Sequence, residues 1–204
     1  MKKKIRNRNA LSFTLMTIGI IIIVVVYLLN AASSKVDSAV REYSCDVKSY
    51  KLNTEIEISD KATGTVLYTV KGNILKVVED PLTLYDAEGT KQAYAGDSYA
   101  FVGQDTHNIY PVDSQGIKMV GKFELTGDSY DIYFEEEKVA KAEFNAFNTY
   151  GSLKDMNGNL IADYTSKPLM NDYVVHVAND KVFSERLLLM IFASYYSDQH
   201  ADHK

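Results

Sequence analysis

The stretch that decides the fold is residues 184–198, Ser-Glu-Arg-Leu-Leu-Leu-Met-Ile-Phe-Ala-Ser-Tyr-Tyr-Ser-Asp. Leu187 to Ala193 are all apolar, and at about 100° per residue they occupy every side of a helix. The uncharged part of this helix would rise only about 16 Å, roughly half of a hydrocarbon core, so it cannot span a membrane. The sequence therefore predicts a central helix over 184–198, enclosed by protein, with Ser184 as its N-cap.

The segment that precedes this helix alternates between apolar and polar residues, the pattern of half-buried strands. The alternation recurs in short runs, and turn-forming residues separate them, which predicts about twelve antiparallel strands in sequential hairpins. The predicted inward sets include Ile56 and Ile58; Val66, Tyr68 and Val70; Leu82 and Leu84; Ile117 and Met119; Tyr130, Ile132 and Phe134; and Tyr173, Val175 and Val177. The predicted turns are Asp60–Gly64, Gly72–Asn73, Asp86–Gly89, Asp113–Gly116, Gly127–Asp128, Asn157–Gly158 and Asn179–Asp180.

One predicted strand, residues 139–147, has an inward face made mostly of alanine. Ala140, Ala142, Phe144 and Ala146 face one way, and Val139 faces the other. Small inward residues suit a wall that surrounds something bulky, as a central helix would be. We therefore expect a mainly β protein: an antiparallel barrel over residues 47–198, closed around the helix, followed by a polar tail at 199–204.

The N-terminal region has the pattern of a membrane anchor. Residues 1–9 are a basic tail, and the apolar segment 10–32 is long enough to span a bilayer as a helix. The tail predicts a cytoplasmic N-terminus, which would place the barrel outside the cytoplasm. A cleavable signal peptide is the competing interpretation, although the apolar run is longer than such peptides need.

Residues 33–46 are predicted to be a short helical stalk or, alternatively, a disordered linker. Beyond the basic tail the chain carries 17 basic and 27 acidic residues, a formal charge of −10. We expect no basic cluster beyond residue 10, which excludes nucleic acid as a partner. Cys45 is the only cysteine, so the chain cannot form an internal disulfide, and an unpaired thiol is expected.

Two segments resemble a known family. Ile-Ser-Asp-Lys-Ala-Thr-Gly-Thr-Val-Leu-Tyr-Thr-Val-Lys-Gly at 58–72, Leu-Thr-Leu-Tyr-Asp-Ala-Glu-Gly at 82–89 and the apolar terminal helix resemble the LURP-one-related family. That family is similar to the tubby C-terminal domain and the phospholipid scramblases, so the resemblance implies a twelve-stranded barrel around a hydrophobic helix over residues 48–198. It also implies lipid handling as one possible function. No binding residue is carried over, because tubby domains bind phosphoinositides through basic side chains and this domain is acidic.

Several groups of polar residues are candidate sites, but none of them predicts catalysis, a metal or a cofactor. The tail residues Asp198, His200, Asp202 and His203 could ligate a metal but are expected to be solvated, and Asp155–Asn159 fits a hairpin turn better than a calcium loop. His107 is expected in a loop and His176 on an outer strand face, with no nucleophile motif beside either. Glu135–Glu137 is expected at a hairpin tip, and Tyr195 and Tyr196 at the rim of the barrel.

Three classes of function remain open. A membrane-tethered interaction module outside the cytoplasm needs no catalytic group, and its ligand would be an envelope protein, a polymer or a lipid. Lipid handling follows from the resemblance alone. An enzyme would need titratable groups that converge at a barrel end, which a linear sequence can hide.

Overall fold

The computed structural model describes residues 39–50, 53–73, 82–98, 106–124, 127–166 and 172–201. These ranges contain twelve strands and one helix. They are β1 (Arg41–Tyr50), β2 (Asn53–Asp60), β3 (Val66–Asn73), β4 (Leu82–Asp86), β5 (Lys91–Ser98), β6 (Thr106–Pro111), β7 (Ile117–Glu124), β8 (Gly127–Phe134), β9 (Glu137–Asn145), β10 (Tyr150–Asp155), β11 (Leu160–Ser166), β12 (Tyr173–Val177) and α2 (Glu185–Ala201).

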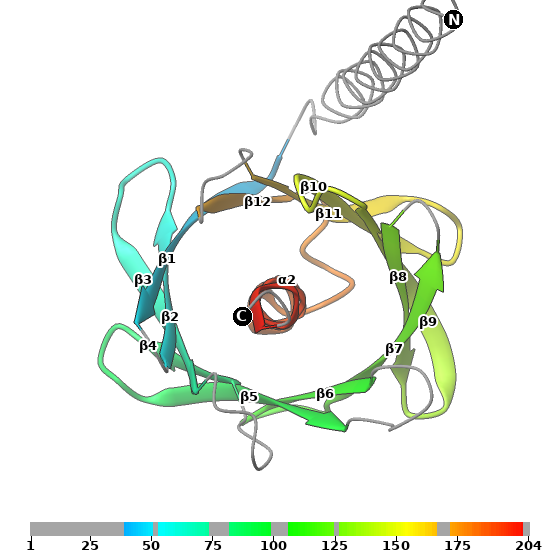
Figure 1. Ribbon diagram of the computed structural model, residues 1–204, viewed down its shortest axis with the longest axis horizontal. Helices are drawn as coiled ribbons and strands as arrows, with labels where there is room; N and C mark the ends of the chain where they lie inside the picture. Colours follow the sequence, from blue (N-terminus) through cyan, green and yellow to red (C-terminus); the bar gives the residue numbers. More distant parts are fainter. Residues whose placement is uncertain are drawn as a thin grey trace, which may run out of the picture. The chain divides into compact units, whose positions relative to one another are not determined.

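The twelve strands form one closed antiparallel barrel (Figure 1). Each strand pairs with its neighbours in sequence, and β1 closes the sheet by pairing with β12, where Arg41 lies opposite Val177 and Cys45 opposite Tyr173. Closure leaves no sheet edge with unpaired backbone groups, so the predicted barrel is confirmed.

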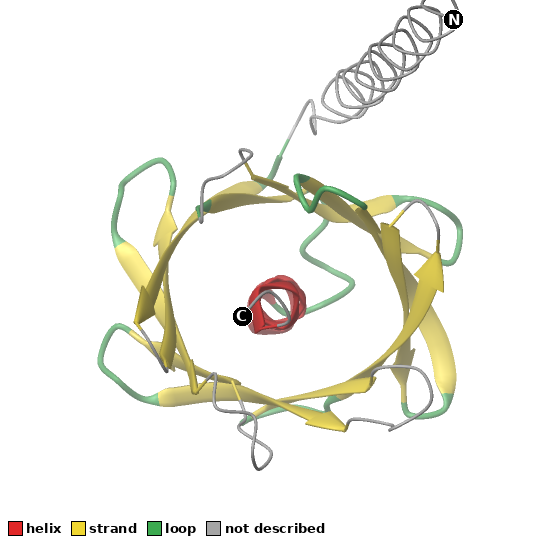
Figure 2. Cartoon of the chain, viewed as in Figure 1, coloured by secondary structure: helices red, strands yellow, loops and turns green. Residues whose placement is uncertain are grey.

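Helix α2 lies inside the barrel (Figure 2). Every residue from Leu187 to Tyr196 is buried, and the most exposed of them, Leu187, retains only 6% of its surface. Ser184 caps the helix as predicted, since its Oγ accepts a hydrogen bond from the Leu187 N–H at 3.4 Å. The helix therefore supplies the interior packing that a barrel of this width requires.

Small side chains line the barrel wall where the helix lies close to it, and large side chains fill the space elsewhere. The backbone of α2 lies closest to β4, β5 and β6, and the inward residues of β5 are the buried alanines Ala93 and Ala95. Ala140 and Ala142 of β9 also face inward as predicted. Because the helix approaches β5 closely, larger residues can fill the wider gap on the other side.

Aromatic rings fill much of that gap. Phe144 stacks on Tyr195 of the helix with ring centroids 3.4 Å apart, and Tyr130, Tyr164 and Phe192 surround the pair. Tyr196 stacks on Tyr173 at 5.0 Å. The two helix tyrosines are thus core residues, and the prediction that they lie at the barrel rim was wrong.

The connections at one end of the barrel, the helix-start end, link β2 to β3, β4 to β5, β6 to β7, β8 to β9, β10 to β11 and β12 to α2. The turns predicted at Asp60–Gly64, Asp86–Gly89 and Asn157–Gly158 lie here, each with glycine at positive φ. Gly72–Asn73, however, lies within β3, and Gly127–Asp128 begins β8.

The boundaries of the barrel also differ from the prediction. Strand β1 begins at Arg41, so residues 41–46 form part of the barrel wall instead of the predicted stalk or linker. The helical spacing that suggested a stalk included Tyr43, but in β1 both Tyr43 and Cys45 point into the core. The predicted tail and anchor, residues 1–32, lie outside the described residues.

Candidate functional site

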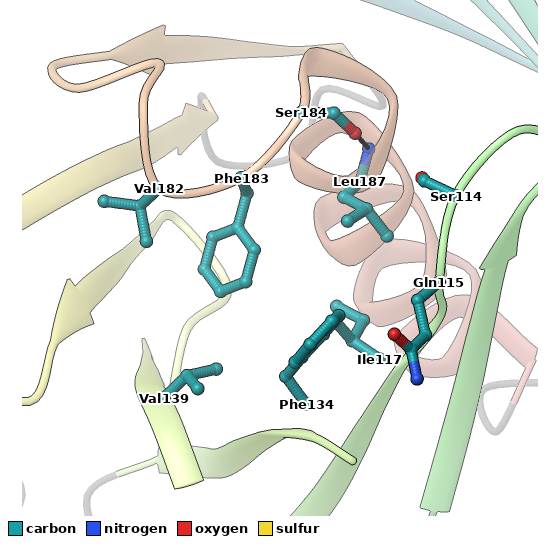
Figure 3. A pocket seen from close by; sticks show the side chains of 9 residues that line it. All are labelled: Ser114, Gln115, Ile117, Phe134, Val139, Val182, Phe183, Ser184 and Leu187. Atoms are coloured by element: carbon teal, nitrogen blue, oxygen red, sulfur yellow. Dashed lines mark hydrogen bonds between the residues drawn. The ribbon is translucent and has the colours of Figure 1, made fainter. Parts of the chain in front are cut away.

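A pocket of about 460 Å³ opens at the helix-start end (Figure 3). It lies where four parts of the chain meet: the β6–β7 connection, the ends of β7, β8 and β9, the β12–α2 connection and the first turn of α2. Its lining residues are Ser114, Gln115, Ile117, Phe134, Val139, Val182, Phe183, Ser184 and Leu187.

Apolar side chains form most of the pocket, from its floor to its lip. Ile117, Phe183 and Leu187 are almost fully buried, whereas Phe134 and Val182 remain 38% and 40% exposed at the lip. An exposed phenylalanine and valine beside an apolar hollow provide surface that a ligand can remove from water.

A β-bulge places one of the lining residues. In the β8–β9 pair, Ile132 lies opposite Ala140 and Tyr133 opposite Lys138, so Val139 is the extra residue. Bulges re-aim side chains at barrel rims, and here Val139 lines the pocket. Its predicted outward orientation, which assumed strict alternation with Ala140, was therefore wrong.

Two of the three polar side chains that line the pocket have hydrogen-bond partners. Ser184 caps α2, and the side-chain N–H of Gln115 donates to Glu135 at 2.7 Å. None of the nine lining residues carries an acid, a base or a thiol. The pocket can therefore enclose an apolar group, but its own walls offer nothing for proton transfer or nucleophilic attack.

Two ion pairs tie the first turn of the helix to the barrel wall beside the pocket. Arg186 lies 2.6 Å from Asp113, and Arg41 lies 2.6 Å from Glu185. The hydrogen bond to Asp113 raises the pKa of Arg186 above its ordinary value. Because both pairs are partly exposed, each contributes at most about 1 kcal/mol to stability.

His176 lies on the outer strand face as predicted, and the structure pairs it with a carboxylate. Its Nδ1 lies 2.7 Å from Oδ1 of the fully buried Asp163 on the neighbouring strand. Ser152 of β10 is the cross-strand neighbour of Asp163, so the carboxylate stands between serine and histidine. A histidine must contact the serine to act as its base, so this row is not a catalytic triad.

The structure places the remaining sequence candidates in structural roles. His107 is not in a loop: it is buried in β6 against the ring of Tyr130. The Asp155 carboxylate accepts hydrogen bonds from Asn157 and Asn159, which confirms a hairpin turn. Glu135 to Glu137 span the β8–β9 turn as predicted.

The structure does not test whether the C-terminal tail can ligate a metal. The side chains of Asp198 and His200 lie outside the described part of the chain, as do Asp202 and His203. Among the side chains that the structure does describe, no three possible metal ligands converge.

The sequence did not predict a group of lysines that lie together on the outer face of the barrel. Lys122 and Lys138 flank the buried Asp131 at 2.5 and 2.6 Å, and Lys141 and Lys154 flank Glu143. Although burial alone would raise the pKa of Asp131, the two ammonium groups lower it. Each of these lysines is paired with a carboxylate, so the group is a network of ion pairs, which neighbouring strands bring together from positions far apart in the sequence.

Cys45 is an unpaired, fully buried thiol, as expected. Burial raises its pKa to about 12, so it stays protonated and poorly reactive at neutral pH.

Comparisons with protein-family models, with curated proteins and with solved structures find no match to this chain. No helix within the described ranges has both the length and the hydropathy needed to cross a membrane.

Proposed function

We propose that this protein is a membrane-tethered binding module whose barrel lies outside the cytoplasm. The observation that carries the proposal is the apolar pocket at the helix-start end, which is open to solvent and has no titratable group in its lining. Such a pocket suits binding better than acid–base or nucleophilic catalysis.

The connection to the predicted anchor supports this arrangement. If residues 10–32 span the membrane, residues 33–40 separate the span from the start of β1. Eight residues reach at most about 28 Å when fully extended. Because β1 begins at the helix-start end, the chain that follows the predicted anchor would enter the barrel at the same end as the pocket.

Photo-crosslinking in the native membrane tests the proposal. A photoreactive phenylalanine analogue at Val182, on the pocket lip, should give a discrete adduct. The same analogue at Met156, which is exposed in the β10–β11 turn of the same barrel end, should not. The proposal fails if Val182 gives no adduct or the same adducts as Met156. Protease added to intact cells should cleave the barrel domain; complete protection would refute its location outside the cytoplasm.

Lipid binding is the second candidate function, and the same apolar lining favours it, since a pocket of this kind can also hold an acyl chain. The resemblance to the LURP-one-related, tubby and scramblase families points the same way but is only an analogy. Mass spectrometry of lipids that copurify with the full chain would decide. A lipid present with the wild type and lost from a Val139→Asp variant would support this function.

A further inference from the structure

The charges around the pocket indicate what kind of molecule it binds. Six carboxylates and five basic side chains lie within two residues of a lining residue in the chain: Asp113, Glu135, Glu136, Glu137, Asp180 and Glu185, with Lys118, Lys138, Lys141, Lys181 and Arg186. The two signs nearly balance in number, so the charge at this mouth depends on which of these groups are paired.

Ion pairs neutralise part of this set. Arg186 pairs with Asp113, Glu185 with Arg41, Lys138 with Asp131, and Lys141 with Glu143. Asp180 and Lys181 are neighbours of opposite charge. What remains is Lys118 of β7 and the β8–β9 tip, Glu135 to Glu137, whose three carboxylates form no salt bridge within the described part of the chain; together these four groups carry a formal charge of −2.

The acidic tip is continuous with the apolar lip. Glu135 directly follows Phe134 of the lip, and it accepts the hydrogen bond from Gln115, which lines the pocket. A group that fills the pocket therefore lies beside Glu135, and positive charges on its flanks would interact with the tip wherever they come within about 8 Å of it at physiological ionic strength.

We propose that the pocket binds a protein segment in which a large apolar side chain is flanked by lysine or arginine. This inference rests on the proposed binding function and names its partner class. The apolar side chain would occupy the space between Phe134, Val182 and Leu187, and the basic flanks would face Glu135 to Glu137. The same carboxylates repel anionic headgroups, so charge complementarity favours a basic peptide over an anionic lipid surface.

Peptide titrations test the inference with full-length protein in phosphatidylcholine nanodiscs. The probe is a fluorescent hexapeptide, Lys-Lys-Leu-Phe-Lys-Lys. Its two controls are Glu-Glu-Leu-Phe-Glu-Glu, which reverses the charge, and Lys-Lys-Ser-Ser-Lys-Lys, which removes the apolar pair. We expect the first peptide to bind at least tenfold more tightly than either control, with an affinity that falls as salt is added.

Matched variants locate the binding. Replacing Glu135, Glu136 and Glu137 with Gln should weaken binding of the basic peptide about two- to fivefold per charge. Val182→Asn should weaken it as well, whereas Val66→Asn should not, although Val66 is equally exposed at the same barrel end (41% against 40%). Glu88→Gln, at the β4–β5 turn, controls for a general charge effect.

The inference is overturned if the basic peptide shows no binding up to about 1 mM, if the acidic peptide binds equally well, or if the glutamine and Val182 variants match their controls. Displacement of bound peptide by a zwitterionic single-chain lipid, lysophosphatidylcholine below its critical micelle concentration, would assign the pocket to lipid instead and would also overturn it. If the peptides fail while photo-crosslinking from Val182 still gives its adduct, the partner class is wrong but the binding function stands.

Discussion

Replacing Gly151 with alanine should disturb the aromatic packing that holds the helix inside the barrel. Gly151 of β10 lies opposite Phe144 on one side and Tyr164 on the other. A Cβ at this position would lie 2.3 Å from Cδ1 of Phe144 and 2.8 Å from Cδ1 of Tyr164, whereas ordinary contacts are 3.4–4 Å. The Phe144 ring would have to move by about 1 Å, but it is stacked against Tyr195.

The expected cost combines two effects. Overpacking a dense core costs about 1–3 kcal/mol, and alanine recovers about 0.5–1 kcal/mol because glycine loses more backbone freedom on folding. We therefore expect Gly151→Ala to lower the free energy of unfolding by about 1–2 kcal/mol. For a protein of this size, this corresponds to a fall in Tm of roughly 2–8 °C.

Thermal unfolding of the full chain, followed by the near-ultraviolet circular dichroism of its tyrosines, measures this loss. Gly96→Ala is the control, because no heavy atom lies within 4 Å of a Cβ there; its effect should be neutral or stabilising by up to about 1 kcal/mol. In a Phe144→Ala background the cost of Gly151→Ala should fall, because only the 2.8 Å contact with Tyr164 remains. Equal stability of the two alanine variants, or an unchanged cost without the Phe144 ring, would refute the packing argument.

Three further outcomes follow from buried groups. Leu189→Asp puts a charge on the enclosed helix and should abolish folding of the barrel, whereas a cooperative melt close to wild type would contradict the enclosed-helix structure. Cys45 should resist alkylation at pH 8 in the folded protein and react after unfolding in urea; rapid native labelling would show that the thiol is accessible. The pKa of Asp131 is lowered on folding, so its stabilising effect is complete above pH 4 and is lost as the pH falls further. Asp131→Asn should reduce the loss of stability below pH 4, and an unchanged acid profile would exclude this role.

The fold was predictable because its two main signals are local. A run such as Leu187 to Ala193 has no polar side in a helix, and alternation in segments such as Tyr173 to Val177 assigns one face to the core; both signals are confirmed. The predictions that were wrong had used alternation or helical spacing alone, without knowledge of which strands pair. A bulge turned Val139 towards the pocket, and strand pairing with β12 drew residues 41–46 into the barrel.

The candidate site was not predictable in the same way. The pocket requires Gln115, Phe134, Val182 and Leu187 to meet, and no local pattern records which hairpin tips lie beside the start of the helix. The same applies to the His176–Asp163 pair, whose members are neighbours only across the β11–β12 ladder. Glu135 to Glu137 were correctly placed at a tip, but their role depends on the apolar lip beside them.

The position of the helix explains why the barrel has a pocket at this end. The helix lies nearest β4, β5 and β6, where Ala93 and Ala95 leave room for it, so the wider space is on the side of the remaining strands. Aromatic rings such as Phe144 fill that space deeper in the barrel. At the mouth, the β12–α2 connection must cross from the wall to the interior, and Phe183 and Leu187 supply its buried side chains in the gap beside β7, β8 and β9. The alanines that admit the helix therefore also create the apolar hollow, which couples the fold to the binding site that we propose.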